Sequence, residues 1–393
     1  MTDEFYMRRT IMLARRAQGM TSPNPLVGAI IVKNERIIAE DYHKKAGNPH
    51  AEALVIEKVG TDAIDSILYV NLEPCCHTEK RTPPCTKTII NAGIKKVVIG
   101  MIDPNPNVLG RGIAELRDAG MDVEVGVLEN EARWLNEAYI KYITAGKPFV
   151  TLKVAMTLDG KIATPEGQSK WITGEKSRKL VHRLRGTVDA IVTAIGTVKA
   201  DDPLLTARIK GGKSPARIII DPDLEISLNA QVLRVPPKTY IITSKTRDSQ
   251  LNNSPSPPFI KGGQRGFSRD EKIKTLLDMG VQIITYEGEN LDLNWLMKTL
   301  GEKEIISVLI EGGSSLNYHA LEDGIVDKVM FFISPKIIGG KESFPAVGGR
   351  NFRKLEEAIK IKDLKVRRVG EDILLEGYPT LNLNLLFPLK LTR

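Results

Sequence analysis

Four residues at short spacings, His50, Glu52, Cys75 and Cys85, have the side chains needed for a metal centre. One neutral imidazole and two thiolates would give zinc three protein ligands and leave its fourth tetrahedral position free for water. Zinc held in this way lowers the pKa of its water toward neutrality, which makes hydroxide available at physiological pH. Glu52 is not needed as a ligand and can therefore carry protons. We expect His50, Cys75 and Cys85 to bind zinc and Glu52 to be the catalytic residue.

The spacing favours hydrolytic deamination of a heterocycle. Zinc-dependent deaminases combine His-x-Glu with Pro-Cys and a second cysteine downstream, and their glutamate is not a ligand. Here Pro74 precedes Cys75, but nine residues separate the two cysteine ligands where two are usual. The alternative is a closed structural zinc site with Cys76 or His77 as a fourth ligand. Such a site would have no use for a glutamate beside the histidine.

The composition, with 42% hydrophobic and 26% charged side chains, is typical of a soluble globular protein. A chain of 393 residues is too long to fold around a single hydrophobic core, which indicates two domains. Three cysteines and the absence of an apolar leading segment predict a reducing, cytoplasmic location. No apolar run reaches the roughly 18 residues needed to span a membrane. The net charge of +8 lies beyond residue 147, since residues 1–147 contain equal numbers of basic and acidic side chains. A small phosphorylated substrate therefore fits better than nucleic acid, which would require a basic surface near the zinc.

Alternating helical and strand patterns over residues 1–146 predict a three-layer α/β domain around these residues. Pro49 suits a helix start, so His50 and Glu52 should fall in a first helical turn. The predicted helices cover 5–18, 50–59, a short stretch after Cys85, 112–119 and 129–145. The predicted strands cover 27–32, 37–38, 67–72, 96–100 and 121–127.

A second alternating series predicts another α/β domain over residues 148–380, after a linker at 145–148. Its predicted strands cover 149–155, 190–192, 217–220, 240–242, 281–284, 306–310, 326–333, 361–367 and 372–377. Residues 252–269 are rich in Pro, Gly and Ser and are predicted to be a disordered insertion. Residues 381–393 are predicted to be a tail.

The combined motifs resemble the bifunctional deaminase–reductases of riboflavin biosynthesis over residues 3–378. In the first domain the motifs are Ser22-Pro-Asn-Pro-Leu-Val-Gly28, Pro49-His-Ala-Glu52, Leu72-Glu-Pro-Cys-Cys-His77, Arg81-Thr-Pro-Pro-Cys85 and Gly100-Met-Ile-Asp-Pro-Asn105. In the second domain they are Leu152–Ala163, Ser169–Thr173, Gly196–Pro203 and Glu311–Ser315. The resemblance implies a cytidine-deaminase-like α/β/α domain followed by a dihydrofolate-reductase-like α/β domain.

The same resemblance implies two reactions and their cofactors. Zinc would support deamination of 2,5-diamino-6-ribosylamino-4(3H)-pyrimidinone 5′-phosphate, and NADPH would then reduce the ribosyl chain to ribityl. By position, the implied substrate contacts are Asn24, His43, Arg81, Asn105, Lys153, Ser169, Arg185, Leu205, Arg208 and Glu311. The implied NADPH contacts are Ala155, Trp171, Thr197, Asp201, Gly313, Ser314 and Ser315. Two physical arguments support these sets: a guanidinium fork matches phosphate oxygens, and glycines that open a helix expose N–H groups to phosphate.

Three other hypotheses stay open on the sequence. One is a nucleic-acid or other small-heterocycle deaminase with an unrelated nucleotide-binding domain. Another is a non-catalytic zinc protein whose second domain senses a nucleotide. In the third, only one domain is active. Ala194, where the family often has Gly, and the insertion at 252–269 then point to the reductase half as the inactive one. We also expect a homo-oligomer without nucleic-acid or membrane partners.

Overall fold

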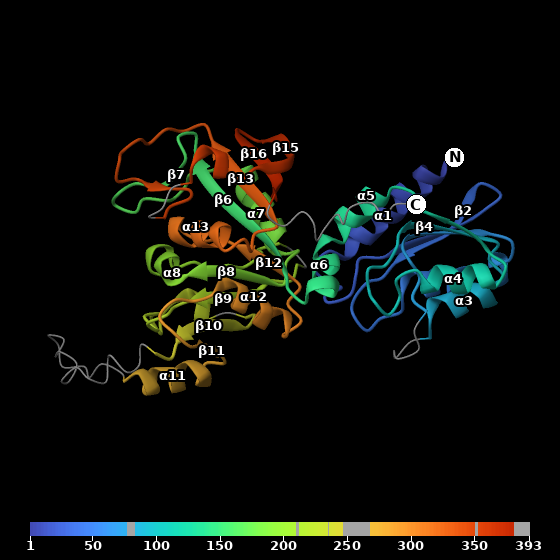
Figure 1. Cartoon of the computed structure of the whole chain (residues 1–393), viewed down its shortest axis with the longest axis horizontal. Helices are drawn as coiled ribbons and strands as arrows, with labels where there is room; N and C mark the ends of the chain where they lie inside the picture. The colour runs from blue at the N-terminus through green and yellow to red at the C-terminus, as the bar shows by residue number, and fades with distance from the viewer. Residues whose placement is uncertain (77–82, 210–211, 235, 247–267, 350–352, 381–393) are drawn as a thin grey trace. The chain divides into compact units, whose positions relative to one another are not determined.

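The computed structural model describes residues 1–76, 83–209, 212–234, 236–246, 268–349 and 353–380. These residues form two compact units, one from Met1–Phe149 with Gly301–Ile306 and the other from the rest of the described chain. Each unit contains helices packed on a sheet (Figure 1). Residues 252–267 of the predicted insertion, and the predicted tail, lie outside the described residues.

The first unit is a three-layer α/β/α sandwich. Its described sheet has the order β2-β1-β3-β4-β5, with β1 antiparallel to β2 and β3, and with β3, β4 and β5 parallel. The strands are β1 (Gly28–Lys33), β2 (Arg36–Tyr42), β3 (Ile67–Leu72), β4 (Lys96–Met101) and β5 (Asp122–Val125). One face is covered by α2 (Ala51–Val59), α3 (Cys85–Asn91) and α4 (Arg111–Asp118). The other face is covered by α1 (Asp3–Ala14), α5 (Glu129–Leu135) and α6 (Glu137–Ala145).

The two-sided packing follows from the strand sequences. Alternate residues of β1 enter different cores: Ala29 and Ile31 pack on the α2 side, while Ile30 and Val32 pack on the α1 side. A strand buried on both faces requires such a continuous apolar run. The central sheet therefore holds the loops at its strand ends in fixed positions.

Two helix predictions in this unit were wrong in detail. The helix predicted over 129–145 is two helices that break at Asn136, whose backbone (φ −107°, ψ 19°) is not helical. The first helix begins earlier than predicted, because the Thr2 hydroxyl accepts a hydrogen bond from the Phe5 N–H and caps it. It ends at Ala14 and continues only as a 3₁₀ turn, Arg15–Ala17.

The second unit is built on a mixed sheet with the described order β11-β10-β9-β8-β12-β6-β13-β16-β15. Strand β13 lies parallel to β6, while β16 is antiparallel to both β13 and β15. The strands are β6 (Phe149–Thr157), β8 (Ala190–Ala194), β9 (Ala216–Ile220), β10 (Thr239–Ser244), β11 (Gln282–Tyr286), β12 (Ser307–Ile310), β13 (Lys328–Ser334), β15 (Ile361–Val369) and β16 (Asp372–Pro379). A separate pair joins β7 (Lys161–Ala163) to β14 (Phe344–Pro345).

The helices of this unit alternate with its parallel strands. They are α7 (Glu175–Arg185), α8 (Ile195–Asp201), α9 (Gln231–Arg234), α11 (Arg269–Asp278), α12 (Leu293–Gly301) and α13 (Ser314–Glu322). Two residues that composition had assigned to the insertion define the start of α11: Ser268 is its N-cap and Arg269 its first residue. The Ser268 hydroxyl accepts from the Glu271 N–H, and the Glu271 carboxylate accepts from the Ser268 N–H, so a capping box defines the helix start.

Substitution of Gly112 by Ala should destabilise the first unit by about 1–3 kcal/mol, the usual cost of overpacking. Gly112 lies in the first turn of α4, where an added Cβ would overlap the Pro74 carbonyl oxygen. Because Pro74 precedes Cys75, the strain should also lower zinc affinity. Denaturant unfolding and metal analysis would measure both effects.

Gly196 provides a matched control. It also occupies the second position of a helix, α8, but nothing lies within 4 Å of an added Cβ. Gly196→Ala should leave stability and zinc content close to those of the parent protein. Equal effects of the two substitutions would contradict the overlap argument.

Candidate active site

The three expected zinc ligands meet at one end of the first unit's sheet. His50 is the N-cap of α2, Cys75 follows β3, and Cys85 is the first residue of α3. The His50 Nδ1 atom lies 3.2 Å from the Cys85 sulfur and 3.6 Å from the Cys75 sulfur. All three ligand atoms lie within 4.8 Å of one another. One nitrogen and two sulfurs at this separation form a donor set that fits zinc.

The two cysteines of this group affect one another's ionisation. Hydrogen bonds from the Cys85 thiol and from His50 lower the pKa of the Cys75 thiol, which favours the thiolate that binds a metal. The pKa of Cys85 is raised because its proton is shared with Cys75 and because it is buried. The Cys76 thiol instead donates to the Asn107 carbonyl at 3.9 Å, away from the three-ligand group. His77, the other proposed fourth ligand, lies outside the described residues.

Glu52 is positioned for proton transfer. It lies in the first turn of α2 and is 3% exposed. Burial raises the pKa of its carboxyl group above the ordinary value. Its Oε2 atom has no hydrogen-bond partner among the residues that the structure describes. A buried carboxylate oxygen without a protein partner fits a site that receives water and substrate.

Asn24 and His43, for which the family resemblance implies substrate contacts, lie beside this group. The His43 Nδ1 atom lies 3.1 Å from the Pro49 carbonyl oxygen and must donate to it. The Nε2 atom is then an acceptor and receives the Asn24 amide at 3.2 Å. The ring centroids of His43 and His50 are 5.5 Å apart. The Pro-Asn-Pro loop is thereby held next to a zinc ligand.

The other two predicted contacts of this unit are less well supported. The Asn105 amide oxygen accepts from the Asn107 N–H at 3.0 Å, within the loop that follows β4. That loop approaches the zinc ligands through the contact between Asn107 and Cys76. Arg81 lies outside the described residues. A substrate contact by either residue stays a prediction.

Glu73 is a site residue that the sequence analysis missed. Its Oε2 atom accepts the N–H groups of Asp103 and Gly110 at 3.1 and 3.0 Å, and its Oε1 atom accepts that of Ile113 at 3.2 Å. Glu73 is 3% exposed and immediately precedes Pro74. Its carboxylate therefore connects the loop that follows β4, which contains Asn105, to the segment after β3 that contains Cys75. An acidic residue at the end of an apolar strand was the available signal.

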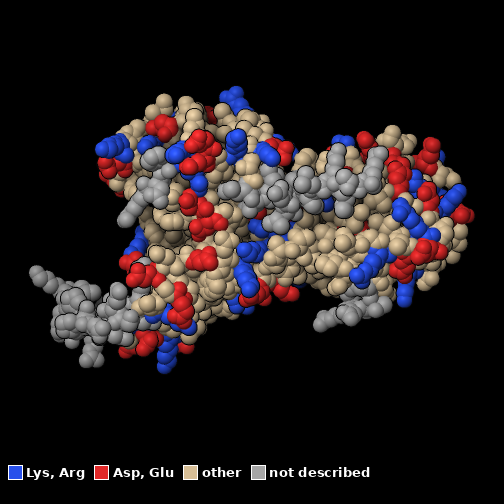
Figure 2. Space-filling model, in the orientation of Figure 1, with Lys and Arg blue, Asp and Glu red and all other residues tan. Residues whose placement is uncertain are grey.

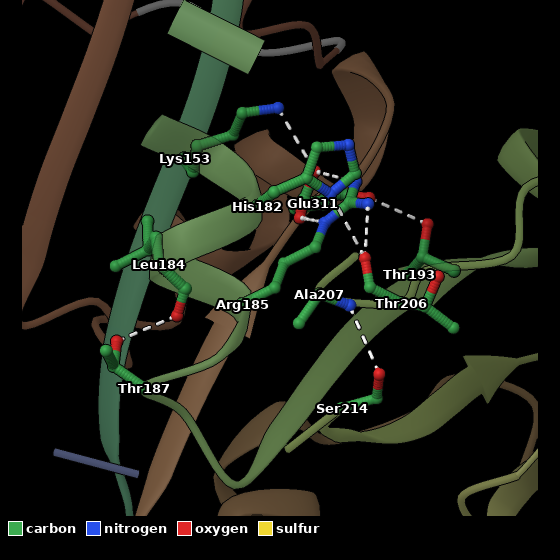
Figure 3. Close-up of polar contacts among 10 residues, drawn as sticks. All are labelled: Lys153, His182, Leu184, Arg185, Thr187, Thr193, Thr206, Ala207, Ser214 and Glu311. Atoms are coloured by element: carbon green, nitrogen blue, oxygen red, sulfur yellow. Dashed lines mark hydrogen bonds and ion pairs between the residues drawn. The ribbon is translucent and has the colours of Figure 1, made fainter. Parts of the chain in front are cut away.

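In the second unit, Glu311 binds two cations that the sequence had assigned to the substrate (Figure 3). Lys153 of β6 contacts the Glu311 Oε2 atom at 3.1 Å. Arg185, at the end of α7, donates Nε to Oε1 at 2.6 Å and a terminal nitrogen to Oε2 at 3.0 Å. Burial opposes ionisation, but Lys153 and Arg185 hold the pKa of Glu311 far below its usual value. The guanidinium fork that we expected to face phosphate is thus paired with a protein carboxylate.

The loop after α8 is fixed to α7 through the Thr206 carbonyl. His182 and Arg185, three residues apart on one helix face, both contact this oxygen, at 3.2 and 3.3 Å (Figure 3). Leu205 and Arg208 on either side have positive φ angles of 53° and 50°. Leu205 is buried and Arg208 is exposed, so Arg208 is accessible to a phosphate group. His182 is a second residue that the sequence analysis missed.

Several predicted NADPH contacts lie together. Gly313 is the N-cap of α13, and a Cβ placed on it would lie 3.6 Å from the Thr197 hydroxyl. The Ser314 hydroxyl is buried and has no partner among the described residues. Exposed N–H groups and an unpartnered hydroxyl at a helix N-terminus fit a cofactor phosphate. Of the other predicted contacts, Ala155 lies on β6 and Ser315 is exposed on α13.

The remaining predicted contacts form a second cluster. The Ser169 hydroxyl contacts Asp201 at 2.9 Å, and Lys170 donates to the Asp201 carbonyl at 3.0 Å. Trp171 is 64% exposed, and the Arg178 guanidinium carbon lies 4.7 Å from the centre of its ring. The Trp171 side chain is thus largely exposed, with a cation over its ring.

Comparison with known proteins identifies the family. The cytidine and deoxycytidylate deaminase zinc-binding region matches residues 1–101, and the RibD C-terminal domain matches residues 148–375. The chain is 43% identical over 378 residues to the riboflavin biosynthesis protein RibD of Actinobacillus pleuropneumoniae, covering 96% of this chain and 95% of that protein. The chain belongs to the RibD family. It is 38% identical to RibD of Escherichia coli K12, covering 95% of this chain and 99% of that one.

Solved RibD structures have the same fold over both units. The Thermotoga maritima deaminase/reductase has a TM-score of 0.81 at 36% identity, covering 96% of this chain and 98% of that chain. RibD of Acinetobacter baumannii, form 1, has a TM-score of 0.81 at 34% identity, covering 96% and 99%. As a member of this family, the chain is a bifunctional deaminase and reductase that uses zinc and NADPH.

Full-length matches do not favour a nucleic-acid deaminase with an unrelated second domain. Basic and acidic side chains are interspersed on the visible face of the RibD-like chain (Figure 2). Among the described residues, no helix combines the length and hydrophobicity that a membrane span requires.

Proposed function

We propose that this chain carries out two successive steps on a phosphorylated pyrimidine. The first is deamination of 2,5-diamino-6-ribosylamino-4(3H)-pyrimidinone 5′-phosphate, and the second is reduction of its ribosyl side chain to ribityl. The observation that carries the first step is the nitrogen–sulfur–sulfur donor set found among the described residues, beside buried Glu52, whose Oε2 atom has no partner among them. The second step is supported by the polar cluster around Glu311 and the unpartnered Ser314 hydroxyl.

In the deamination, bound zinc supplies an activated water. Glu52 would accept a proton from that water and deliver it to the pyrimidine ring nitrogen. Glu52 would next take the remaining proton of the hydroxyl that has added to the ring carbon and pass it to the amine, which leaves as ammonia while the carbonyl forms. Burial raises the pKa of the Glu52 carboxyl, which makes it a better proton acceptor than an exposed glutamate. Asn24, oriented by His43, would hold the ring with its aminated carbon toward the water.

In the reduction, NADPH supplies the hydride. Thr197, Gly313 and Ser314 would hold the cofactor, and Arg208 would bind the substrate phosphate. Lys153 would lie near the reacting carbon, where the Glu311 carboxylate keeps its ammonium group in place. The bidentate contact of Arg185 with Glu311 orients this carboxylate. We also propose that the protein is a homo-oligomer and that it is located in the cytoplasm.

Product masses would test the proposal directly. The purified protein should convert the diaminopyrimidine ribosyl phosphate to a deaminated product with or without NADPH. The ribityl product should appear only with NADPH. Chelation of zinc should stop deamination and spare reduction of the already deaminated intermediate. Failure of the zinc-loaded protein to deaminate this substrate would refute the substrate assignment.

A further inference from the structure

The backbone of Leu26, which directly follows the Pro-Asn-Pro loop, is held by two buried asparagines from distant parts of the chain. The Leu26 carbonyl oxygen accepts the side-chain amides of Asn71 at 2.9 Å and Asn136 at 3.1 Å. The Leu26 N–H donates to the Asn136 Oδ1 atom at 2.8 Å. The Gly28 N–H donates to the Asn71 Oδ1 atom at 2.7 Å. Asn71 is 0% exposed and Asn136 is 2% exposed, so no solvent competes for these contacts.

This arrangement requires amide side chains at both positions. Each asparagine donates to the same carbonyl and accepts from a backbone N–H, and only a primary amide does both with one planar group. A carboxylate has no hydrogen to donate, and an alanine would leave buried backbone groups without partners. The two side chains therefore determine the position of the Leu26 backbone.

The Leu26–Gly28 segment in turn positions two residues of the site. Leu26 follows Asn24 by two residues, and the ring of the intervening Pro25 restricts the backbone between them. Val27 accepts the backbone N–H of His43 at 2.8 Å, and the His43 ring accepts the Asn24 amide at 3.2 Å. Displacement of this segment would shift the Asn24 amide relative to the zinc ligands.

We propose that Asn136 and Asn71 are positioning residues for the deamination and act through Asn24 on the pyrimidine ring. The inference rests on the proposed function. Asn136 stands at the break between α5 and α6, beyond the zinc-binding region that matches residues 1–101. The break in the helix thus gives α5 and α6 a role in the chemistry, in addition to covering the sheet.

A double-mutant cycle tests the route through Asn24. Asn136→Ala should lower kcat/KM for deamination about 10- to 100-fold, the loss expected for a displaced contact residue. Zinc content and reduction of the deaminated intermediate should stay unchanged, which makes the second activity an internal control. In an Asn24→Ala background, Asn136→Ala should add little further loss, because the residue through which it acts is already absent.

Two further variants strengthen the test. Asn136→Asp keeps the side-chain volume and the acceptor for the Leu26 N–H but loses the donor to the Leu26 carbonyl. It replaces the alanine variant in the same measurements if that variant does not fold. Asn91, exposed at the end of α3, is a matched control, and Asn91→Ala should have no effect.

Additive losses in the Asn24→Ala background would overturn the inference, as would loss of zinc or equal loss of both activities. Absence of deamination by the parent protein would instead refute the proposed function, so the two failures are distinguishable.

Discussion

Glu52→Gln is expected to lower kcat for deamination about 10²- to 10⁴-fold, the range that removal of a general acid–base group produces. Glutamine has the same shape as the glutamate but cannot accept and return a proton. Glu52 is not among the three ligands, so the variant should still bind zinc. Deamination rates with metal analysis of the same samples would check the prediction.

Two comparisons show whether the loss of deamination activity comes from the missing proton transfer. Reduction of the deaminated intermediate should be unchanged in the same variant. Glu57→Gln, on the exposed side of α2, should retain full deamination, because that carboxylate lies away from the ligands. Near-normal turnover by Glu52→Gln with zinc bound would show that another group transfers the protons.

Glu311→Gln should abolish most of the reductase activity and destabilise the second unit by about 3–5 kcal/mol, the usual cost of breaking a buried ion pair. The side chains of Glu311, Lys153 and Arg185 are only 8%, 14% and 14% exposed. Loss of the carboxylate would leave both cations without their compensating charge. Denaturant unfolding and NADPH oxidation would measure the two effects.

An exposed pair provides the control for this substitution. Glu175 and Lys179 lie on α7 with side chains 69% and 66% exposed. Glu175→Gln should change neither stability nor reduction measurably, since solvent screens such pairs. If Glu175→Gln and Glu311→Gln lost the same amount of stability, burial of the ion pair would not explain the destabilisation by Glu311→Gln.

The lowered pKa of Glu311 also predicts how the contribution of Glu311 to the stability of the second unit depends on pH. A carboxyl whose folded-state pKa lies below the unfolded value of about 4.3 stabilises the protein fully above that value. The stabilisation is lost as the pH falls toward the folded-state pKa. The stability difference between the parent protein and Glu311→Gln should therefore narrow in acid below about pH 4.

The parts of the site that the sequence predicted are those encoded by local spacing. His50 and Glu52 lie at the start of α2, Cys75 follows β3, and Cys85 begins α3. The strand Ile67–Leu72 was predicted at its observed bounds because it is a continuous apolar run. Asn24 was predicted only through the family resemblance, since Asn between two prolines is otherwise typical of a turn.

The parts that the sequence did not predict depend on contacts between distant residues. Glu73 binds backbone groups 30 to 40 residues away, and Asn136 binds the backbone of Leu26, 110 residues away. No periodicity reports such pairs. Arg185 was expected to face phosphate because of its guanidinium shape, but its partner, Glu311, lies 126 residues along the chain. Sequence motifs identified both residues without showing that they pair.

The position of β6 in the second sheet has a consequence for biosynthesis. This strand lies between β12 and β13, so Phe149–Thr157 emerges from the ribosome long before Ser307–Ile310 and Lys328–Ser334. From residue 157 to residue 334 the ribosome adds 177 residues, which takes roughly 9–35 s at the usual rate of translation. The zinc ligands, by contrast, all lie within residues 50–85 and are made together. A nascent chain therefore holds a complete metal-binding segment while an apolar strand still awaits both neighbours, and chaperones would be needed mainly during synthesis of the reductase.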